Sequence, residues 1–203
     1  MAVEWTQHRF TGGVLALDTT NTVVLRNDPA RRFDRFDDPA EIARFADAAS
    51  LFRSAELGGR RLSAADPAAI RGKVLAMREA ADAAFRGFAT AGAMQSDRLA
   101  RMLAACADGV DGGDERVMGA GAPFGDPARP IDFEAALAVS AISLLAADRL
   151  RRVRICANCS WLFLDNSRNA SRVWCDMAVC GNRQKAKRHY MRHRALERGG
   201  DRV

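Results

Sequence analysis

Apolar residues recur at helical spacing through most of the first 150 positions of the chain. Asp38 followed by Pro39 combines an N-cap residue with a proline at the first helical position, and the pattern predicts a helix through about Ser54. The same Asp-Pro pair opens a longer amphipathic helix over residues 66–92, which ends at a glycine. Each helix is expected to bury one apolar face.

Two further helices are predicted before position 150. The first begins at Ser96 or Asp97, either of which can serve as its N-cap. Its apolar face is formed by Leu99, Met102, Leu103 and Cys106. Residues 108–130 are rich in glycine and proline, which is typical of a loop or an irregular β-hairpin. Asp132 then caps a strongly apolar helix that runs from about Phe133 to Arg149.

The stretch from Phe10 to Arg26 has a mixed pattern. It contains a Gly-Gly turn and many β-branched residues, which favour a strand, but Asp18 or Thr19 is also suited to cap a helix. Periodicity alone leaves both structures open. The first three-quarters of the chain is therefore predicted to be a helical domain of four main helices with a little β structure.

The character of the sequence changes after position 150. Two short aromatic and β-branched runs, Trp161–Asp165 and Ser171–Cys175, flank a polar turn at 166–169, which predicts a β-hairpin. Residues 181–198 then form a basic helix, and two glycines follow it. The overall fold is thus predicted to be mainly α, with a small C-terminal module of hairpin and helix.

The charge of the chain follows the same division. The 203 residues carry 31 basic and 25 acidic side chains, a formal net charge of +6. Residues 1–148 have a net charge of −4, whereas residues 149–203 have 14 basic and 4 acidic side chains, a net charge of +10. Such asymmetry indicates a polyanionic partner for the C-terminal quarter. A solvated basic helix without a partner is the alternative.

Composition and targeting signals narrow the class of protein. Apolar residues make up 48% of the chain and charged residues 28%, which excludes wholesale disorder. The N-terminus lacks the basic start and apolar stretch of a signal peptide. The longest apolar run, Ala135 to Ala147, is too short to span a bilayer. We therefore expect a cytoplasmic protein with no membrane partner.

Four of the five cysteines lie within 25 positions of one another. They are spaced as Cys156-x2-Cys159 and Cys175-x4-Cys180. In a reducing compartment this clustering predicts metal ligands, with free thiols or a redox pair as the alternatives. Four thiolates suit tetrahedral Zn²⁺ and leave no open position for catalysis. Cys106 stands apart on an amphipathic helix and is expected to be a small buried apolar residue.

The predicted elements around these cysteines suggest how they meet. A hairpin of about fifteen residues would bring the second pair back to the first, and Cys180 would lie at the start of a helix, where the dipole favours a thiolate. A turn, a hairpin and a helix that share one metal resemble a treble-clef zinc finger. His189 and His193 also have zinc-ligand spacing, but four cysteines already complete the site.

The C-terminal segment resembles a known family, the CGNR zinc finger. The motif of that family stands here as Cys180-Gly181-Asn182-Arg183. Flanking residues that also match are Phe163, Asp165, Ser167-Arg168-Asn169, Arg172, Trp174-Cys175 and Lys185. The resemblance implies a zinc-dependent DNA-binding module over residues 151–203.

The N-terminal LALDTTNTVV is similar to the opening of the ABATE domain, through Leu17-Asp18 and Asn21-Thr22. This domain accompanies the CGNR finger in stress-induced bacterial transcription regulators. The resemblance implies that residues 1–150 form a helical domain that senses a small ligand or a protein partner. Asp18 and Asn21, beside a Gly-Gly turn, are candidate ligand-binding residues, with turn or cap residues as the alternative.

The basic helix supplies most of the candidate nucleic-acid contacts. They are Arg183, Lys185, Lys187, Arg188, Arg192 and Arg194, together with Arg168 and Arg172 in the hairpin. Phosphates would supply charge-driven affinity, and arginine forks can read guanine edges. In the alternative structural interpretation, Asn182 caps the helix and Arg183 pairs with Asp165 or Asp176.

The apolar residues of the module are also open to two interpretations. Trp161, Phe163 and Trp174 either stack on bases or form a small core and its contact with the helical domain. The apolar positions of the basic helix are expected to pack on the finger. They are Ala186, Tyr190, Met191 and Ala195.

The sequence thus predicts a bacterial transcription regulator that binds DNA and is not an enzyme, because no P-loop, HExxH or GxSxG motif occurs. An RNA-binding protein and a thiol-based redox stress sensor are the alternatives. Competition between duplex DNA and RNA separates the first alternative, and zinc release under mild peroxide tests the second. A homodimer would increase the specificity of a single finger.

Overall fold

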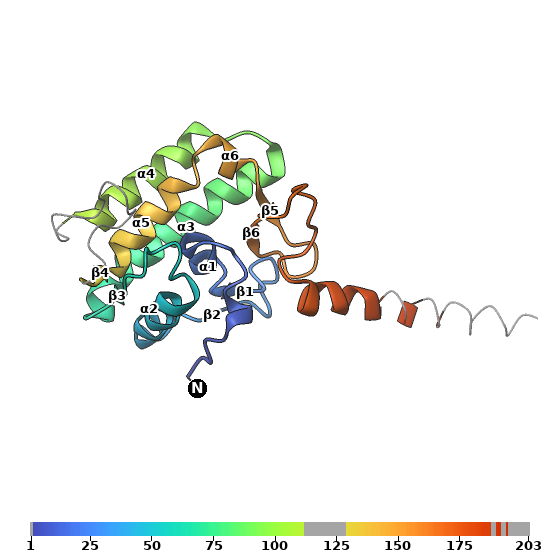
Figure 1. Ribbon diagram of the computed structural model, residues 1–203, viewed down its shortest axis with the longest axis horizontal. Coiled ribbons are helices and arrows are strands. Elements are labelled where there is room, and N and C mark those ends of the chain that lie inside the picture. The colour runs from blue at the N-terminus through green and yellow to red at the C-terminus, as the bar shows by residue number, and fades with distance from the viewer. Residues whose placement is uncertain (1, 112–128, 188–189, 192–193, 195–203) are drawn as a thin grey trace, which may run out of the picture.

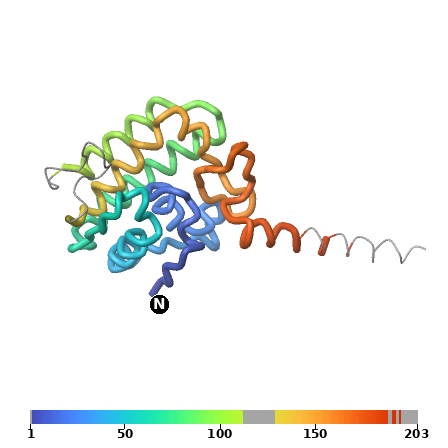
Figure 2. The backbone as a smooth tube through the Cα atoms, viewed as in Figure 1, coloured from blue at the N-terminus to red at the C-terminus, as the bar shows by residue number. Residues whose placement is uncertain are grey.

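The structure, a computed structural model, describes residues 2–111, 129–187, 190–191 and 194. Figure 1 shows a body of packed helices with a small β-hairpin at one side, and a helix that leaves the hairpin and points away from the body. The tube in Figure 2 follows the same path. The helices are a 3-10 turn η1 (Gln7–Arg9), α1 (Leu15–Thr20), α2 (Ala40–Phe52), α3 (Pro67–Ala91), α4 (Ser96–Val110), α5 (Phe133–Ser143), α6 (Ala147–Leu150) and a π-helical turn η2 (Met177–Gly181). The predicted mainly α fold with a small C-terminal finger is confirmed.

Three two-stranded sheets accompany the helices. Strands β1 (Val23–Val24) and β2 (Phe33–Asp34) are antiparallel, and β3 (Leu62–Ser63) pairs in parallel with β4 (Ile131–Asp132). Strands β5 (Val153–Ile155) and β6 (Leu162–Leu164) form the antiparallel hairpin. Residues 112–128, which hold most of the predicted glycine- and proline-rich loop, lie outside the described residues.

Both Asp-Pro pairs mark the start of a helix, as predicted, although α2 begins one residue late, with Pro39 as its N-cap residue. The Asp38 carboxylate accepts a hydrogen bond from the Ala40 amide at 2.9 Å, just where α2 begins. The Asp66 carboxylate accepts from the Ala69 amide at 2.9 Å and caps α3. Gly92 ends that helix in the left-handed conformation, with φ of 73°. Local capping chemistry therefore fixes both helices.

Helix α4 is present as predicted, but the prediction of its buried face and of its N-cap is less accurate. Helix α4 buries Met102 and Cys106 in the core, but Leu103 is 42% exposed, so its expected place on the buried face is wrong. The helix begins without a side-chain cap, so the expected capping by Ser96 or Asp97 is also wrong. Successive positions 102 and 103 are 100° apart on a helix, and only one of them can face the centre of the core.

A single helix from Phe133 to Arg149 was expected, and the structure divides it into α5 and α6. The chain tightens where α5 ends, because the Leu144 amide donates to the Ala141 carbonyl three residues back. The Ser143 hydroxyl adds a bond to the Ser140 carbonyl at 2.7 Å. Asp132 is the N-cap residue of α5, as predicted, but its side chain makes no capping hydrogen bond.

The ambiguous N-terminal stretch contains both of the structures that its sequence left open. A short buried helix, α1, is followed directly by strand β1. Asp18 and Thr19 lie inside α1, so neither is its N-cap. Gly12 is required because a Cβ there would lie 2.7 Å from the Asp18 amide nitrogen. That close approach lets the Gly12 amide donate to the Asp18 carboxylate at 2.7 Å.

Aromatic rings fill the core between α2 and the N-terminal segment. The ring of Phe45 has four aromatic neighbours with centroids 5.0–5.8 Å away, in stacked or edge-on arrangements. They are Trp5, Phe10, Phe36 and Phe133. Helix α1 packs against α3, α5 and β6, so it lies between the helices and the hairpin.

The C-terminal hairpin is docked on this body rather than tethered to it. Three of its apolar side chains belong to the main core: Val153, Leu162 and Leu164. The Leu164 amide donates to the Gly12 carbonyl at 2.8 Å, and the Arg86 guanidinium donates to the Ser160 carbonyl at 2.8 Å. The division of the chain at residue 150 stays a prediction, but the two parts share one apolar core.

Candidate metal centre

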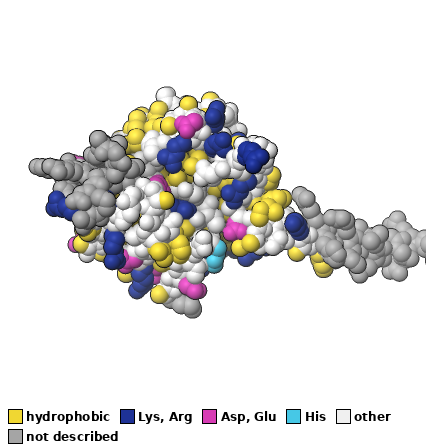
Figure 3. Space-filling view, viewed as in Figure 1, with side chains coloured by type: hydrophobic (Ala, Val, Ile, Leu, Met, Phe, Trp, Pro, Cys, Tyr) yellow, Lys and Arg dark blue, Asp and Glu magenta, His cyan; other side chains and the backbone are white. Residues whose placement is uncertain are grey.

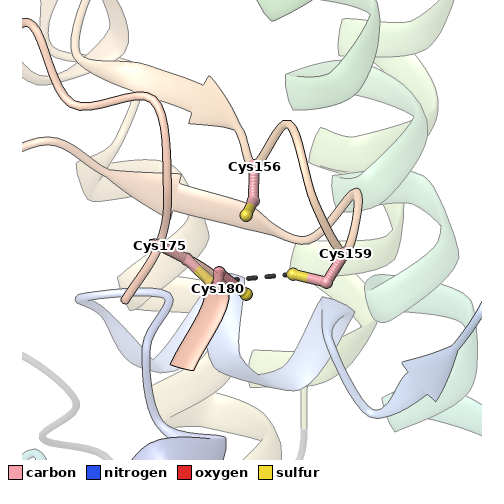
Figure 4. Close-up of side chains that lie close together, drawn as sticks. All are labelled: Cys156, Cys159, Cys175 and Cys180. Carbon is pink, nitrogen blue, oxygen red and sulfur yellow. Dashed lines mark hydrogen bonds between the residues drawn. The ribbon is translucent and has the colours of Figure 1, made fainter. Parts of the chain in front are cut away.

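The four clustered cysteines converge on one point. Their sulfur atoms all lie within 4.8 Å of one another, and Figure 4 shows the four side chains gathered together, with Cys180 on a helical turn. The Sγ atom of Cys175 is 3.6 Å from that of Cys159 and 3.7 Å from that of Cys180. A tetrahedral zinc ion with Zn–S bonds of ~2.3 Å needs sulfur separations of about 3.8 Å. The two separations measured from Cys175 therefore match those of a tetrahedral Zn²⁺ site, and all four sulfurs lie close enough together to share one ion.

The first pair of cysteines lies in the turn of the β5–β6 hairpin. The Cys156 amide donates to the Trp161 carbonyl at 2.8 Å, and the Ser160 amide donates back to the Cys156 carbonyl at 2.9 Å. Ser160 adopts a left-handed conformation with φ of 62°, which closes the loop. Two sulfurs are thus presented from one tight turn, as the Cys-x2-Cys spacing predicted.

The second pair comes from the segment that leads into the basic helix. The Asp176 carboxylate caps η2 by accepting from the Val179 amide at 3.0 Å, and Cys180 lies inside that turn. Asp176, and not Asn182, is therefore the capping residue, which corrects the sequence prediction. Gly181 has no positive φ, so it does not serve as a left-handed turn; it is buried against the side chain of Met177. A π-helical turn is a frequent feature of functional sites.

The electrostatics of the cluster also favour a cation. Hydrogen bonds from Cys159 and Cys175 lower the pKa of Cys156. Contacts with Cys156 and Cys175 raise the pKa of Cys159. A divalent cation would stabilise the thiolate form of all four sulfurs. All five cysteines are free, and burial raises the pKa of the distant Cys106 to about 11.

The C-terminal module contains a two-stranded hairpin, but it is not the hairpin that the sequence predicts. Residues 171–175 were expected to pair with 161–165; instead β6 pairs with β5, the run that precedes the first cysteines. A backbone hydrogen bond joins the hairpin turn to residues 171–175, from the Ala157 amide to the Val173 carbonyl at 3.1 Å. The sequence prediction is wrong because Val153–Ile155 is a β-branched run that competes for the same partner.

Asp165 and Arg172 support the loop between the two cysteine pairs. The buried Asp165 carboxylate accepts from the amides of Ser167 and Arg172 at 2.9 and 2.8 Å. Burial opposes its ionisation, but these bonds outweigh that effect and lower its pKa. The Arg172 guanidinium donates to the Cys175 carbonyl and lies 5.3 Å over the Phe163 ring. Arg172 therefore has internal partners that compete with any contact to nucleic acid.

The aromatic residues of the finger are used inside the protein. Phe163 is fully buried and packs with the cysteines, and Trp174 lies partly buried against the same cluster. Trp161 is partly buried, and the Arg35 guanidinium lies 5.4 Å over its ring. Of the two interpretations given for these side chains, the structure favours the small core with a contact to the body, above all for Phe163.

Apart from Arg172, the basic candidates fall into two groups. Those exposed to solvent in the described residues are Arg168, Arg183, Lys185, Lys187 and Arg194. Arg188 and Arg192 lie outside the described residues, as do His189 and His193. Within the described part of the chain Arg183 makes no ion pair with Asp165 or Asp176, so that expected pairing is wrong.

The apolar side chains of the basic helix do not pack on the finger. Tyr190 is 60% exposed and Met191 57% exposed, and Ala186 is exposed as well, so this prediction is wrong; Ala195 lies outside the described residues. Only the first turn is held, because the Gln184 side chain donates to the Asn158 side chain at 2.8 Å. The helix leaves the body as soon as the metal centre is complete (Figure 1).

Asp18 and Asn21, the candidate ligand-binding residues, are both buried and have internal partners. Asp18 forms an ion pair with Arg53 at 2.5 Å. The Asn21 side chain donates to the Leu162 carbonyl at 2.8 Å and accepts from the Leu162 amide at 3.0 Å. Asn21 therefore holds strand β6 to the body by two hydrogen bonds, a connection called here the Asn21 clasp. Binding of a small ligand by these residues stays a hypothesis, and the geometry supports the structural alternative.

The burial of Asp18 predicts a pH effect on stability. Burial raises its pKa from 3.8 to about 6, and the Arg53 guanidinium only partly offsets this. The folded state then holds a proton that the unfolded state releases, so stability falls as pH rises through this range. Between pH 5 and 7 the loss is about 1 kcal/mol. In urea unfolding, the stability of the wild type relative to Asp18→Asn should fall by this amount from pH 5 to 7; a constant difference would contradict it.

Sequence reasoning missed several residues that position the site. Arg86 and Gln184 each hold a loop of the finger by a side-chain hydrogen bond, and Arg35 packs over Trp161. Their contacts span up to 126 positions, so local patterns carry no signal for Arg35 or Arg86. Gln184 follows the recognisable motif directly and lies one helical turn from Cys180, which is a signal that sequence alone offers.

The fold and the site together define a protein with a C-terminal zinc-binding module of four cysteines, a hairpin and a helix. Residues 152–193 match the family model of the CGNR zinc finger. No curated protein and no solved structure matches the chain. The match covers about a fifth of the chain and does not extend to the N-terminal residues, whose resemblance to the ABATE domain stays a hypothesis. None of the described helices is both long and apolar enough to cross a membrane.

Proposed function

We propose that this protein is a bacterial transcription regulator that binds duplex DNA through the basic helix that begins at Asn182. The observation that carries the proposal is the exposure of the basic side chains on a helix that leaves the metal centre. Arg183, Lys185, Lys187 and Arg194 are all exposed, and none of them forms an ion pair within the described residues. An α-helix fits the major groove of B-DNA, which is about 12 Å wide.

The zinc centre would act as the anchor of this helix. Cys180 lies in the turn where the helix begins, and Gln184 ties the next turn to the loop of the first cysteine pair. Cys180 and the loop that carries Cys156 and Cys159 would both be held by the metal. Binding of Zn²⁺ would therefore fix the direction in which the basic residues of the helix point. A complete set of four thiolates supports a binding role for the module rather than a catalytic one.

Basic side chains also gather beside the helix. Figure 3 shows Lys and Arg side chains over α6 and the hairpin. In that region Arg151 and Arg168 are exposed, and Arg149 and Arg154 are partly exposed. This surface would extend the electrostatic attraction for a nucleic-acid backbone beyond the helix itself. The charge of the chain therefore supports nucleic acid as the partner.

Two substitutions on the helix test this proposal. Arg183→Gln with Lys187→Gln should weaken binding of the zinc-loaded protein to duplex DNA at least tenfold, because two phosphate contacts are lost. The wild-type affinity should fall with salt with a log–log slope of about −4 to −5, and the variant slope should be shallower by about 2. Fluorescence anisotropy with a duplex selected from a random pool measures both.

Arg101→Gln is the matched control, because Arg101 is 77% exposed on α4 and paired only with Asp97. It should leave the affinity and the slope unchanged. Structured RNA and single-stranded DNA are added as competitors of the duplex. A salt-independent affinity, or no affinity of the zinc-loaded protein for duplex DNA, would contradict the proposal. Preferential binding of RNA would instead support the alternative of an RNA-binding protein.

A further inference from the structure

A cleft of about 220 Å³ lies between the N-terminal segment and the metal centre. His8, Arg9 and Arg35 line it from the body, and Trp161 and Arg183 line it from the finger. Residues from both parts of the chain therefore face one cavity at the foot of the basic helix. The sequence indicated none of the three body residues as part of a binding site.

Arg35 is the unusual side chain in this cleft. It is only 8% exposed, and it forms no ion pair with any described carboxylate. One of its guanidinium nitrogens donates to the Asn21 carbonyl at 3.2 Å, which is its one side-chain hydrogen bond within the described residues. Buried charges are normally paired, so an arginine in this state has unused capacity to bind an anion.

The surroundings of Arg35 add positive charge rather than remove it. Burial lowers its pKa to about 10, and the nearby Arg9 guanidinium contributes in the same direction. Arg9 donates its Nε hydrogen to the Glu4 carbonyl and has no ion pair among the described residues. Two guanidinium groups, neither paired with a carboxylate of the described residues, therefore share the body side of the cleft.

Aromatic rings hold Arg35 in place without neutralising its charge. Its guanidinium lies 5.9 Å from the Trp5 ring, 5.7 Å from the Phe33 ring and 5.4 Å from the Trp161 ring. Such contacts offset part of the cost of burial and fix the plane of the guanidinium. A fixed plane of N–H donors matches the oxygen atoms of a phosphate.

We propose that this cleft binds a phosphate group, held between the guanidinium groups of Arg9 and Arg35. The inference rests on the proposed function, because the phosphate it commits to belongs to the backbone of the nucleic acid that the basic helix contacts. Asp176 and the zinc thiolates lie at the finger side of the cleft and would repel an anion. The phosphate is therefore placed at the Arg9–Arg35 end, and the nucleic-acid interface extends onto the N-terminal body.

The test uses the zinc-loaded full-length protein and the variants Arg9→Gln and Arg35→Gln. Arg9→Gln should reduce affinity for the selected duplex about tenfold and make the salt slope shallower by about 1, as expected for one lost phosphate contact. Arg101→Gln should change neither. Zinc content and circular dichroism confirm that each variant is folded. Arg35 is buried, so Arg9→Gln decides the question if Arg35→Gln does not fold.

A second measurement distinguishes a site for backbone phosphate from a site for free phosphate. It also distinguishes failure of this inference from failure of the proposed function. Inorganic phosphate is titrated against tryptophan fluorescence, because Trp161 lines the cleft and Trp5 lies against the Arg35 guanidinium. A change in the wild type that is absent in Arg9→Gln supports the phosphate site even if no nucleic acid binds. If the wild type binds DNA but Arg9→Gln binds it equally well with the same slope, the inference is overturned. The inference is also overturned if the variants lose zinc while the salt slope stays unchanged. Arg9 and Arg35 would then balance the negative charge of the zinc thiolates rather than bind phosphate.

Discussion

Replacing Cys175 with alanine is expected to abolish zinc binding and to unfold the finger from Val153 onward. Cys175 lies between two other ligands, with its sulfur 3.6 Å from that of Cys159 and 3.7 Å from that of Cys180. Zinc contributes about 10–16 kcal/mol to the folding of comparable peptides, and three ligands retain little of it. Zinc content measured by mass spectrometry and near-ultraviolet circular dichroism report the two losses.

The unfolding should also reach the body. The hairpin contributes apolar side chains to the main core, so exposing them weakens the packing of α1 and α5 around them. We therefore expect a lower midpoint of thermal unfolding for the whole chain, and not a separate loss of one small module. The same result should follow when a chelator removes the metal from the wild type.

Cys106→Ala is the control for the loss of a thiol. Cys106 is buried on α4, far from the four ligands, and its replacement should leave one zinc ion per chain. The small cavity that it creates should lower stability by about 1 kcal/mol. Retention of zinc by Cys175→Ala, or its loss from Cys106→Ala, would show that the ligands are assigned wrongly.

The second large effect is expected for Asn21→Ala, which removes the clasp between the body and strand β6. The substitution leaves the amide and the carbonyl of Leu162 without partners in a buried place. Unsatisfied buried groups cost ~1–3 kcal/mol each, so the free energy of unfolding should fall by about 2–5 kcal/mol. Urea unfolding followed by circular dichroism measures the change.

A second measurement shows where the effect acts. Hydrogen exchange at the Leu162 amide should become much faster in Asn21→Ala, while zinc is still bound at saturating metal. Asn27→Ala is the control, because Asn27 is exposed in the turn after β1 and should leave both readouts unchanged. Equal stability of Asn21→Ala and the wild type would show that the clasp does not hold the finger.

The sequence predicts those parts of the structure that local chemistry determines. The Asp-Pro pairs and Gly92 fix two helices because capping acts within four residues. The four cysteines identify the metal centre because their types and spacing match what zinc requires. For the helices the physical cause lies between neighbours in the chain, and for the metal centre the residue types themselves carry the signal.

The parts that fail depend on contacts between distant residues. Strand β6 has two β-branched candidate partners, and tertiary packing of Val153 in the core selects β5. The exposure of Tyr190 and Met191 follows from the direction in which the helix leaves the body, which no local pattern encodes. The sequence also does not predict a role for Arg35, because its aromatic neighbours come from the distant positions 5, 33 and 161.

The docking of the hairpin on the body limits how the finger can be used apart from it. A fragment that begins at Arg151 would keep all four ligands, yet it would present Val153, Leu162 and Leu164 to water and lose the partner of the Leu162 backbone. Zinc loading alone would not hide this surface. Grafting the module onto another protein therefore requires polar replacements at these three positions, or transfer of α1 along with it.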